Sequence, residues 1–287
     1  MPNNYPIVLA HGIAPFDVWS PIIERILRPG LAARSEYFKQ IVPDIEKAGH
    51  EVLTTRVSFA GRLDQRAREL GDQITVYLAR RPSCPKVHII GHSMGGLDSR
   101  CMIAEKPNIS ERIASLTTIG TPHNGTPVAD FWQLNRNDSA ASRALDVLRP
   151  ILDLEGFKDL TTQACAERNR QWRKSESANR VFYQTYSSWE EKDAVFPPLR
   201  HAWQVISHAG TTDEERRNDG LVPVLSQCWQ DPPKEITRQE FPFQADHLNE
   251  IGWWDIAEIV QGNWQPGKFE KQVRDIYLGI ARTVSAL

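Results

Sequence analysis

A serine stands among glycines in the segment Gly91-His92-Ser93-Met94-Gly95-Gly96. The apolar run Val87–Ile90 precedes it, and a helical pattern follows it to about Glu105. A strand that turns into a helix within so few residues forces the serine into a strained backbone conformation. The pattern predicts that Ser93 is a nucleophile at the start of a helix, where backbone N–H groups and the helix dipole favour an oxyanion. A chance Gly-x-Ser-x-Gly is the alternative, and the strand–turn–helix context disfavours it.

Two backbone N–H groups are the candidates for binding such an oxyanion. One belongs to Met94, the residue after the serine. The other belongs to Ile13, because His11-Gly12-Ile13 follows the apolar run Ile7–Ala10 and Gly12 lets the backbone pass close to a substrate carbonyl. An ordinary turn at a strand end, with His11 in a structural role, is the alternative.

The serine needs a base, and His247 is the expected one. Where the nucleophilic serine lies on a turn between a strand and a helix, the chain order is serine, acid, histidine. His247 lies late in the chain, ahead of an apolar segment, as the base should. His201 and His208 precede the best acid, and His123 lies in a Gly-Thr-Pro turn where packing against the site wall is the expected role.

The expected acid is Asp219 in the segment Asn218-Asp219-Gly220-Leu221-Val222. Gly220 permits a tight turn, and the apolar residues after it bury the segment, so that the carboxylate is fixed beneath the histidine. A simple Asx turn is the alternative role for Asp219. Asp213 and Asp246 are weaker rivals, the latter because sequence neighbours such as Asp246 and His247 rarely present their side chains to one another.

Strand-like and helix-like segments alternate along the chain. Apolar or β-branched runs occur at 7–10, 51–57, 87–90, 113–119, 181–186 and 235–241, and amphipathic helices at 63–78 and 269–286. This alternation predicts right-handed crossovers and a mostly parallel central sheet flanked by helices.

The alternation lapses between Gly125 and Asn179, which predicts a helical cap, or lid, inserted over one end of the sheet. A single domain over residues 1–287 is therefore expected, with the insertion at 125–179 inside it. The insertion holds more apolar residues than a solvated loop needs, and a fixed helical pair packed on the sheet explains them about as well. These residues are Phe131, Trp132, Leu134, Leu145, Leu148, Ile151, Leu152 and Leu154.

Composition excludes several classes of protein. A chain of 287 residues can bury a core without disulfide or metal. A net charge of −2 without long single-sign runs argues against nucleic-acid partners and a polybasic anchor. No apolar run approaches the roughly 18 residues of a membrane span, and the start lacks a signal-peptide pattern. The sequence predicts a soluble protein, cytoplasmic as numbered or secreted if a signal peptide has been removed.

The four cysteines have no metal-ligand spacing. Buried free thiols are expected at Cys84, Cys101, Cys165 and Cys228, with a Cys165–Cys228 bridge as the alternative.

Six segments resemble the bacterial triacylglycerol lipases of the α/β-hydrolase fold. They are YPIVLAHGI, IIGHSMGGLDSR, TIGTPHNGTPVAD, DLTTQACAERN, NDGLVPVLSQ and DHLNEIGW, spread over about residues 5 to 254 in the family's order. The resemblance implies an α/β-hydrolase fold with a triad of Ser93, Asp219 and His247. It also implies an oxyanion hole formed by Ile13 and Met94, and a helical lid in the insertion.

The chain departs from that family at two kinds of metal site. Many relatives hold calcium near the catalytic histidine with an acidic residue two positions after it, and here that residue is Asn249, beside a Glu250 expected to point elsewhere. A neutral amide is a weaker calcium ligand than a carboxylate, so calcium is disfavoured, unless Asp246 or Asp255 supplies the charge. The zinc-binding insertion rich in His and Asp that some relatives carry is also missing, and no cofactor is expected.

The expected function is hydrolysis of lipid or small carboxylic esters, in part at a lipid–water interface. Ser93 attacks the acyl carbonyl, His247 transfers the proton, and Asp219 holds the imidazolium. An esterase, an acyltransferase or a polyester depolymerase would use the same triad. A catalytically silent α/β-hydrolase that serves as a binding module is the alternative outside enzymes, although such proteins usually lack a residue of the machinery that this chain retains.

Overall fold

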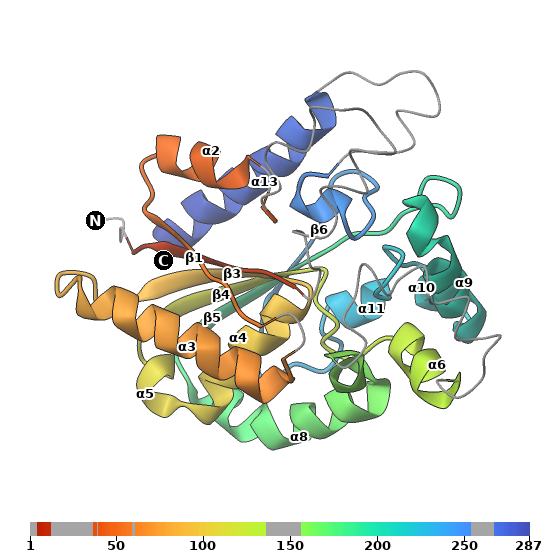
Figure 1. The fold of residues 1–287 in the computed structure, drawn as a ribbon, viewed down its shortest axis with the longest axis horizontal. Coiled ribbons are helices and arrows are strands. Elements are labelled where there is room, and N and C mark those ends of the chain that lie inside the picture. Colours follow the sequence, from red (N-terminus) through yellow and green to blue (C-terminus); the bar gives the residue numbers. More distant parts are fainter. Residues whose placement is uncertain (1–4, 13–36, 39, 59–60, 136–155, 254–266) are drawn as a thin grey trace.

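Six parallel strands form one sheet in the order β2-β1-β3-β4-β5-β6 (Figure 1). The computed structural model describes residues 5–12, 37–38, 40–58, 61–135, 156–253 and 267–287, and every structural statement below concerns those residues. The strands are β1 (Ile7–Ala10), β2 (Val52–Thr54), β3 (Val87–His92), β4 (Ile113–Ile119), β5 (Phe182–Ser187) and β6 (Thr237–Glu240). The predicted parallel sheet is confirmed.

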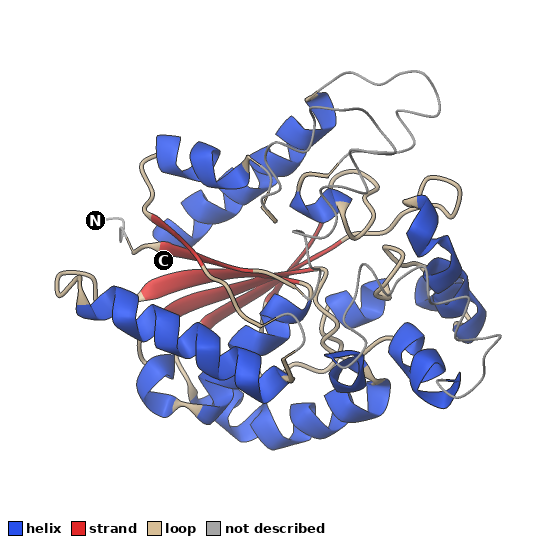
Figure 2. Ribbon diagram, in the orientation of Figure 1, coloured by secondary structure: helices blue, strands red, loops and turns tan. Residues whose placement is uncertain are grey.

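Helices cover both faces of the sheet (Figure 2). On one face α4 packs between α3 and α8, and on the other α13 packs against α2. These helices are α2 (Ile41–Lys47), α3 (Leu63–Ala79), α4 (Met94–Glu105), α8 (Thr162–Ala178) and α13 (Lys268–Ser285), and the short α5 (Pro107–Ser110) follows α4.

Shorter helices gather beyond the carboxyl ends of the strands, at the right of Figure 1. They are α6 (Pro127–Asn135), α9 (Arg200–Ala209), α10 (Asp213–Arg216) and α11 (Val224–Gln227). Three 3₁₀ turns complete the described elements: η2 (Gly156–Leu160), η3 (Pro197–Leu199) and η4 (Asn249–Ile251). In open α/β sheets this end is the one that carries sites.

The core lies between the sheet and its helices. Ile7, Val8 and Leu9 of β1 have no exposed surface, as expected for an apolar strand that is covered on both faces. Helix α13 buries Val273, Tyr277 and other residues spaced by three or four, so the predicted amphipathic face is the one that meets the sheet.

The carboxyl-terminal part of the expected insertion is helix α8. Helix α8 packs along α4 on the face of the sheet and connects β4 to β5, so it is an ordinary crossover helix. A fully buried ion pair between Arg100 Nε and Glu176 Oε1, 2.8 Å apart, joins the two helices. The alternation of strands and helices therefore continues through this part of the chain.

The rest of the expected cap is described only in part. Trp132 of α6 is buried, whereas Leu134 is 83% exposed. Leu145, Leu148, Ile151, Leu152 and Leu154 lie outside the described residues.

The cysteines are all free thiols, which excludes the Cys165–Cys228 bridge in this structure. Cys101 and Cys165 are buried as expected, but Cys84 and Cys228 are only half-buried. Among the described residues, none of the helices combines the length and the apolar character that spanning a membrane requires.

Candidate active site

Ser93 occupies the single residue between strand β3 and helix α4. Its backbone has φ 55° and ψ −130°, a conformation that residues with a Cβ rarely adopt. The structure fixes it from both sides: Ser93 N donates to Ile119 O at 2.9 Å, and Thr121 Oγ1 donates to Ser93 O at 2.8 Å. The strained turn predicted from the sequence is present.

The neighbouring glycines allow the backbone to close around this turn. A Cβ on Gly95 would lie 2.3 Å from Ala10 O, and one on Gly91 would lie 2.9 Å from Gly95 O. Contacts this short are not tolerated, so only glycine permits α4 to start so close to β1 and β3.

His247 lies between Ser93 and Asp219. Its Nε2 is 2.9 Å from Ser93 Oγ, and its Nδ1 is 2.7 Å from Asp219 Oδ2. The three residues are almost entirely buried, with exposed fractions of 7% for Ser93, 4% for His247 and 0% for Asp219. The structure thus brings together the serine, base and acid that the sequence singled out.

A turn within its own segment holds the Asp219 carboxylate. Oδ1 accepts the N–H groups of Leu221 and Val222 at 2.8 and 2.7 Å, which the φ of +97° at Gly220 makes reachable. Oδ2 also accepts Gln227 Nε2 at 3.1 Å, from α11. Asp219 therefore makes the Asx turn and also faces the histidine, so the two roles are not exclusive.

The two rival acids lie elsewhere. Asp213 is exposed on α10. The carboxylate of Asp246 is buried and accepts the N–H groups of Phe196, Leu248 and Asn249, at 2.7 to 2.9 Å. It therefore braces the loop that carries His247.

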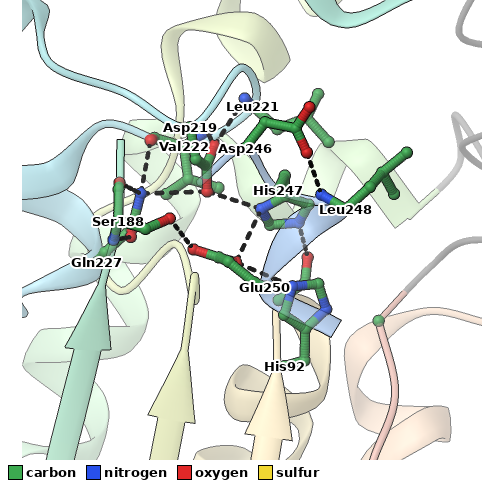
Figure 3. A network of polar contacts seen from close by, with 12 residues as sticks. His92, Ser188, Asp219, Leu221, Val222, Gln227, Asp246, His247, Leu248 and Glu250 are labelled. Carbon is green, nitrogen blue, oxygen red and sulfur yellow. Dashed lines mark hydrogen bonds and ion pairs between the residues drawn. The ribbon is translucent and has the colours of Figure 1, made fainter. Parts of the chain in front are cut away.

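A second carboxylate, which the sequence analysis did not foresee, lies under His247. Figure 3 shows contacts from the His247 ring to both Asp219 and Glu250. Glu250 Oε2 is 3.6 Å from His247 Nδ1 and 3.0 Å from His92 Nε2, and Ser188 Oγ donates to Oε1 at 2.6 Å. The sequence led us to expect only that Glu250 points away from the family's calcium position. In the structure its carboxylate points toward His247 and His92. Burial first, and then the charge of Asp219, raise the pKa of Glu250 well above its usual range.

The loop after β1 lies against the nucleophile. A Cβ on Gly12 would be 2.9 Å from Ser93 Cβ and 3.2 Å from Ser93 Oγ. Arg66 Nη2 donates to His11 O at 3.1 Å and to Gly12 O at 3.2 Å. The same guanidinium pairs with Asp98 Oδ2 at 2.7 Å, one turn into α4, and the pair is buried.

The two expected oxyanion donors stand differently in the structure. Met94 is the first residue of α4 and is fully buried. Ile13 lies outside the described residues. His11 packs within the loop: its Nε2 accepts Val57 N at 3.1 Å, and burial, reinforced by the charge of Arg66, lowers its pKa to about 4.

The other histidines do not join the serine. His123 is buried beside Arg100 and stacks on Trp229, with ring centroids 4.6 Å apart. His201 and His208 belong to α9.

The residues around His247 that the structure describes do not fit a calcium ion. Asn249 Oδ1 accepts Asp246 N at 2.9 Å and Asn249 Nδ2 donates to Trp253 O at 3.2 Å, so the amide at the family's ligand position serves its own loop. The Asp246 carboxylate is occupied by three backbone N–H groups, whereas calcium wants several oxygens. Asp255 lies outside the described residues.

Comparisons of the sequence find lipases. Residues 60–146 match the family of the PGAP1-like alpha/beta domain. A triacylglycerol lipase of Pseudomonas fragi is 28% identical over 282 residues, which cover 87% of this chain and 88% of that protein. A triacylglycerol lipase of Pseudarthrobacter phenanthrenivorans is 33% identical over 134 residues, 46% of this chain. That match and a similar one in Burkholderia plantarii span only 37% and 33% of those relatives.

Solved structures share the fold of this chain. Lipase 1 from Pelosinus fermentans superposes with a TM-score of 0.65 at 18% identity, covering 99% of both chains. EstA from Clostridium botulinum gives 0.62 at 19% identity, covering 99% of this chain and 88% of that one. Together with the parallel sheet, these superpositions show that the chain has the α/β-hydrolase fold, and its sequence is similar to those of triacylglycerol lipases.

Proposed function

We propose that the protein hydrolyses carboxylic esters of lipids through a covalent acyl-enzyme formed on Ser93. The observation that carries the proposal is the continuous hydrogen-bonded series from Ser93 Oγ through His247 to Asp219, at 2.9 and 2.7 Å. A serine hydroxyl is a weak nucleophile unless such a base takes its proton, and the base is effective when a carboxylate orients it. The lipid part of the proposal draws on the relatives, which are named as triacylglycerol lipases.

The reaction proceeds in two halves. Ser93 Oγ bonds to the acyl carbon while its proton moves to His247 Nε2, and the alcohol leaves with that proton. Water then gives a proton to His247 and bonds to the same carbon, and Ser93 regains its proton as the carboxylic acid leaves. Asp219 stabilises the imidazolium in both halves.

The oxyanion of each tetrahedral intermediate needs backbone donors. Met94 N–H lies at the amino terminus of α4, where the helix dipole adds positive potential. Ile13 N–H, after the Gly12 that borders Ser93, is the second donor in this proposal.

The test uses a fluorophosphonate that labels activated serines, with mass spectrometry to locate the label. We expect label on Ser93 in the wild type, none in Ser93→Ala, and a loss of p-nitrophenyl ester turnover by roughly three orders of magnitude or more in the variant. Ser177→Ala, at an exposed position on α8, is the control and should match the wild type. Equal labelling or near-normal turnover of Ser93→Ala would exclude Ser93 as the nucleophile. Added alcohol in the same assay separates hydrolysis from acyl transfer.

We also propose that one α/β-hydrolase domain spans residues 1–287 and that α6 belongs to its cap. Helix α6 lies beyond the carboxyl ends of the strands and presents Leu134 to solvent, as a helix that meets lipid would. Leu134→Ser should then lower the rate on emulsified triglyceride more than on a soluble short-chain ester. Val76→Ser on α3, another exposed apolar residue, is the control and should change neither. Equal losses on the two substrates would argue against this role for α6.

A further inference from the structure

The side chain of Tyr37 connects the loop after β1 to the turn that carries Ser93. Gly12 N donates to Tyr37 Oη at 2.8 Å, and the same oxygen is 2.6 Å from His92 Nδ1. Gly12 borders Ser93, and His92 precedes it in the chain. The Tyr37 hydroxyl therefore contacts the Gly12 backbone beside the nucleophile and the side chain of the residue that precedes the nucleophile.

The connection continues to the base. His92 Nε2 is 3.0 Å from Glu250 Oε2, which is 3.6 Å from His247 Nδ1. The His92 and His247 rings also lie against each other, with centroids 4.6 Å apart. His92, Glu250 and His247 are at most 4% exposed, so little water competes for these contacts.

The hydrogen bonds along this series depend on one another. Burial, together with the nearby His247, lowers the pKa of His92 well below its usual range, so the ring is neutral and carries one N–H. If Glu250 is ionised, His92 Nε2–H donates to it and the Tyr37 hydroxyl donates to His92 Nδ1. If Glu250 is protonated, it donates to His92 Nε2, and His92 Nδ1–H donates to Tyr37 Oη. In both forms the Tyr37 hydroxyl is the partner of His92 Nδ1 while His92 Nε2 is paired with Glu250.

We propose that Tyr37 is a positioning residue for the ester hydrolysis, because its hydroxyl fixes the Gly12 peptide beside the nucleophile and, through His92 and Glu250, the orientation of the base. The inference rests on the proposed function. Tyr37 acts through these groups, so its loss should affect the chemical step and leave substrate binding largely intact. A merely structural tyrosine would affect stability and not the turnover of the folded enzyme.

The first experiment compares Tyr37→Phe with Tyr183→Phe. Like Tyr37, Tyr183 has an Oη that accepts an N–H, here from Asn179 Nδ2, but the contact lies at the amino end of β5, away from the site. On a soluble p-nitrophenyl ester we expect Tyr37→Phe to lower kcat about tenfold with KM within about twofold, because small displacements of reacting groups have large effects on rate. Tyr183→Phe should keep the wild-type kcat. Equal kcat for Tyr37→Phe and the wild type, at matching folded fractions, would overturn the inference.

The second experiment tests the route through His92. His92→Asn retains an amide toward Tyr37 but is too short to reach Glu250. If Tyr37 acts through His92, the double variant should lose much less kcat than the product of the two single losses. Losses that multiply fully would show that Tyr37 does not act through His92.

Labelling by the fluorophosphonate separates this inference from the function on which it rests. We expect Tyr37→Phe to be labelled on Ser93 at about a tenth of the wild-type rate, since phosphonylation needs the same base and donors. A wild-type labelling rate in Tyr37→Phe overturns the positioning role and leaves the proposed function standing. A wild type that takes no label on Ser93 overturns the proposed function, and the positioning role falls with it.

Discussion

The backbone N–H of His247 donates to the backbone carbonyl of Asp219 at a distance of 2.9 Å. The loops that carry the base and the acid are thus joined through the main chain, beside the side-chain contact of 2.7 Å. Changing the acid side chain therefore leaves the two loops in register, and the effect of such a change reports on chemistry more than on folding.

Asp219→Asn should lower kcat by about three to four orders of magnitude with little change in the unfolding midpoint, because an amide favours the wrong histidine tautomer. Asp213→Asn, at an exposed site, should leave both quantities unchanged. Asp246→Asn should mainly lower the unfolding midpoint, since three backbone N–H groups depend on its carboxylate. Steady-state kinetics and thermal unfolding of the three variants check this ranking. A larger kcat loss for Asp246→Asn than for Asp219→Asn would reverse the assignment of the acid.

Arg66 and Asp98 should separate stability from catalysis. Removing one partner of a buried pair leaves an uncompensated charge, so Asp98→Leu should reduce the free energy of unfolding by about 3 to 5 kcal/mol. The double variant Arg66→Met/Asp98→Leu should recover much of that loss, since it buries no charge. Its kcat should nevertheless lie below that of the wild type, because His11 O and Gly12 O lose the Arg66 donor. A wild-type kcat in the double variant would show that the pair is needed for stability only.

His88 should make the fold sensitive to acid at a distance from the site. It has no exposed surface, its Nδ1 is 2.8 Å from Ser115 Oγ, and burial lowers its pKa to about 4 from an unfolded value of 6.5. The unfolded chain therefore binds the proton more readily than the folded chain does. The contribution of neutral His88 to the free energy of unfolding is complete above pH 6.5 and is lost as the pH falls toward 4.

For His88→Asn, which does not titrate, the free energy of unfolding relative to the wild type should rise by about 2 kcal/mol between pH 7 and pH 5. Denaturant unfolding of both proteins at the two pH values measures the difference. Parallel pH dependences would mean that His88 is protonated as easily in the folded state as in the unfolded state.

Chelation should leave the protein unchanged. In the described part of the loop around His247, the side chains of Asn249 and Asp246 form hydrogen bonds with backbone groups of the same loop. We expect excess EDTA to change neither the esterase rate nor the unfolding midpoint. A drop in either that calcium restores and magnesium does not would establish a calcium site.

The sequence was sufficient for the elements whose signals are local. The run at 113–119 forms β4 with the predicted bounds, and the glycines around Ser93 predict a turn that the structure shows as a positive φ. Asp219 could be identified because Gly220 after it indicates a tight turn, and within that turn the Asp219 carboxylate accepts the N–H of Leu221.

The parts that sequence reasoning missed depend on residues brought together from distant segments. Tyr37, His92 and Glu250 meet only in the folded sheet, and no periodicity links them. One signal was nevertheless available: Glu250 is three residues after His247 and lies in the 3₁₀ turn η4, and residues so spaced lie on one side of such a turn. Helix α8 falls within the expected insertion because its sequence is largely polar, and its buried Glu176 pairs with Arg100 of α4 only in the folded protein.

The backbone at Ser93 has a consequence for how such a chain evolves. A residue with a Cβ at φ 55° and ψ −130° destabilises the native state by about 1 to 3 kcal/mol, whereas glycine adopts these angles without strain. Selection for thermal stability alone would therefore replace the nucleophile with glycine and yield a more stable but inactive protein. Among descendants of this protein that abandon catalysis, position 93 is where glycine should first become fixed.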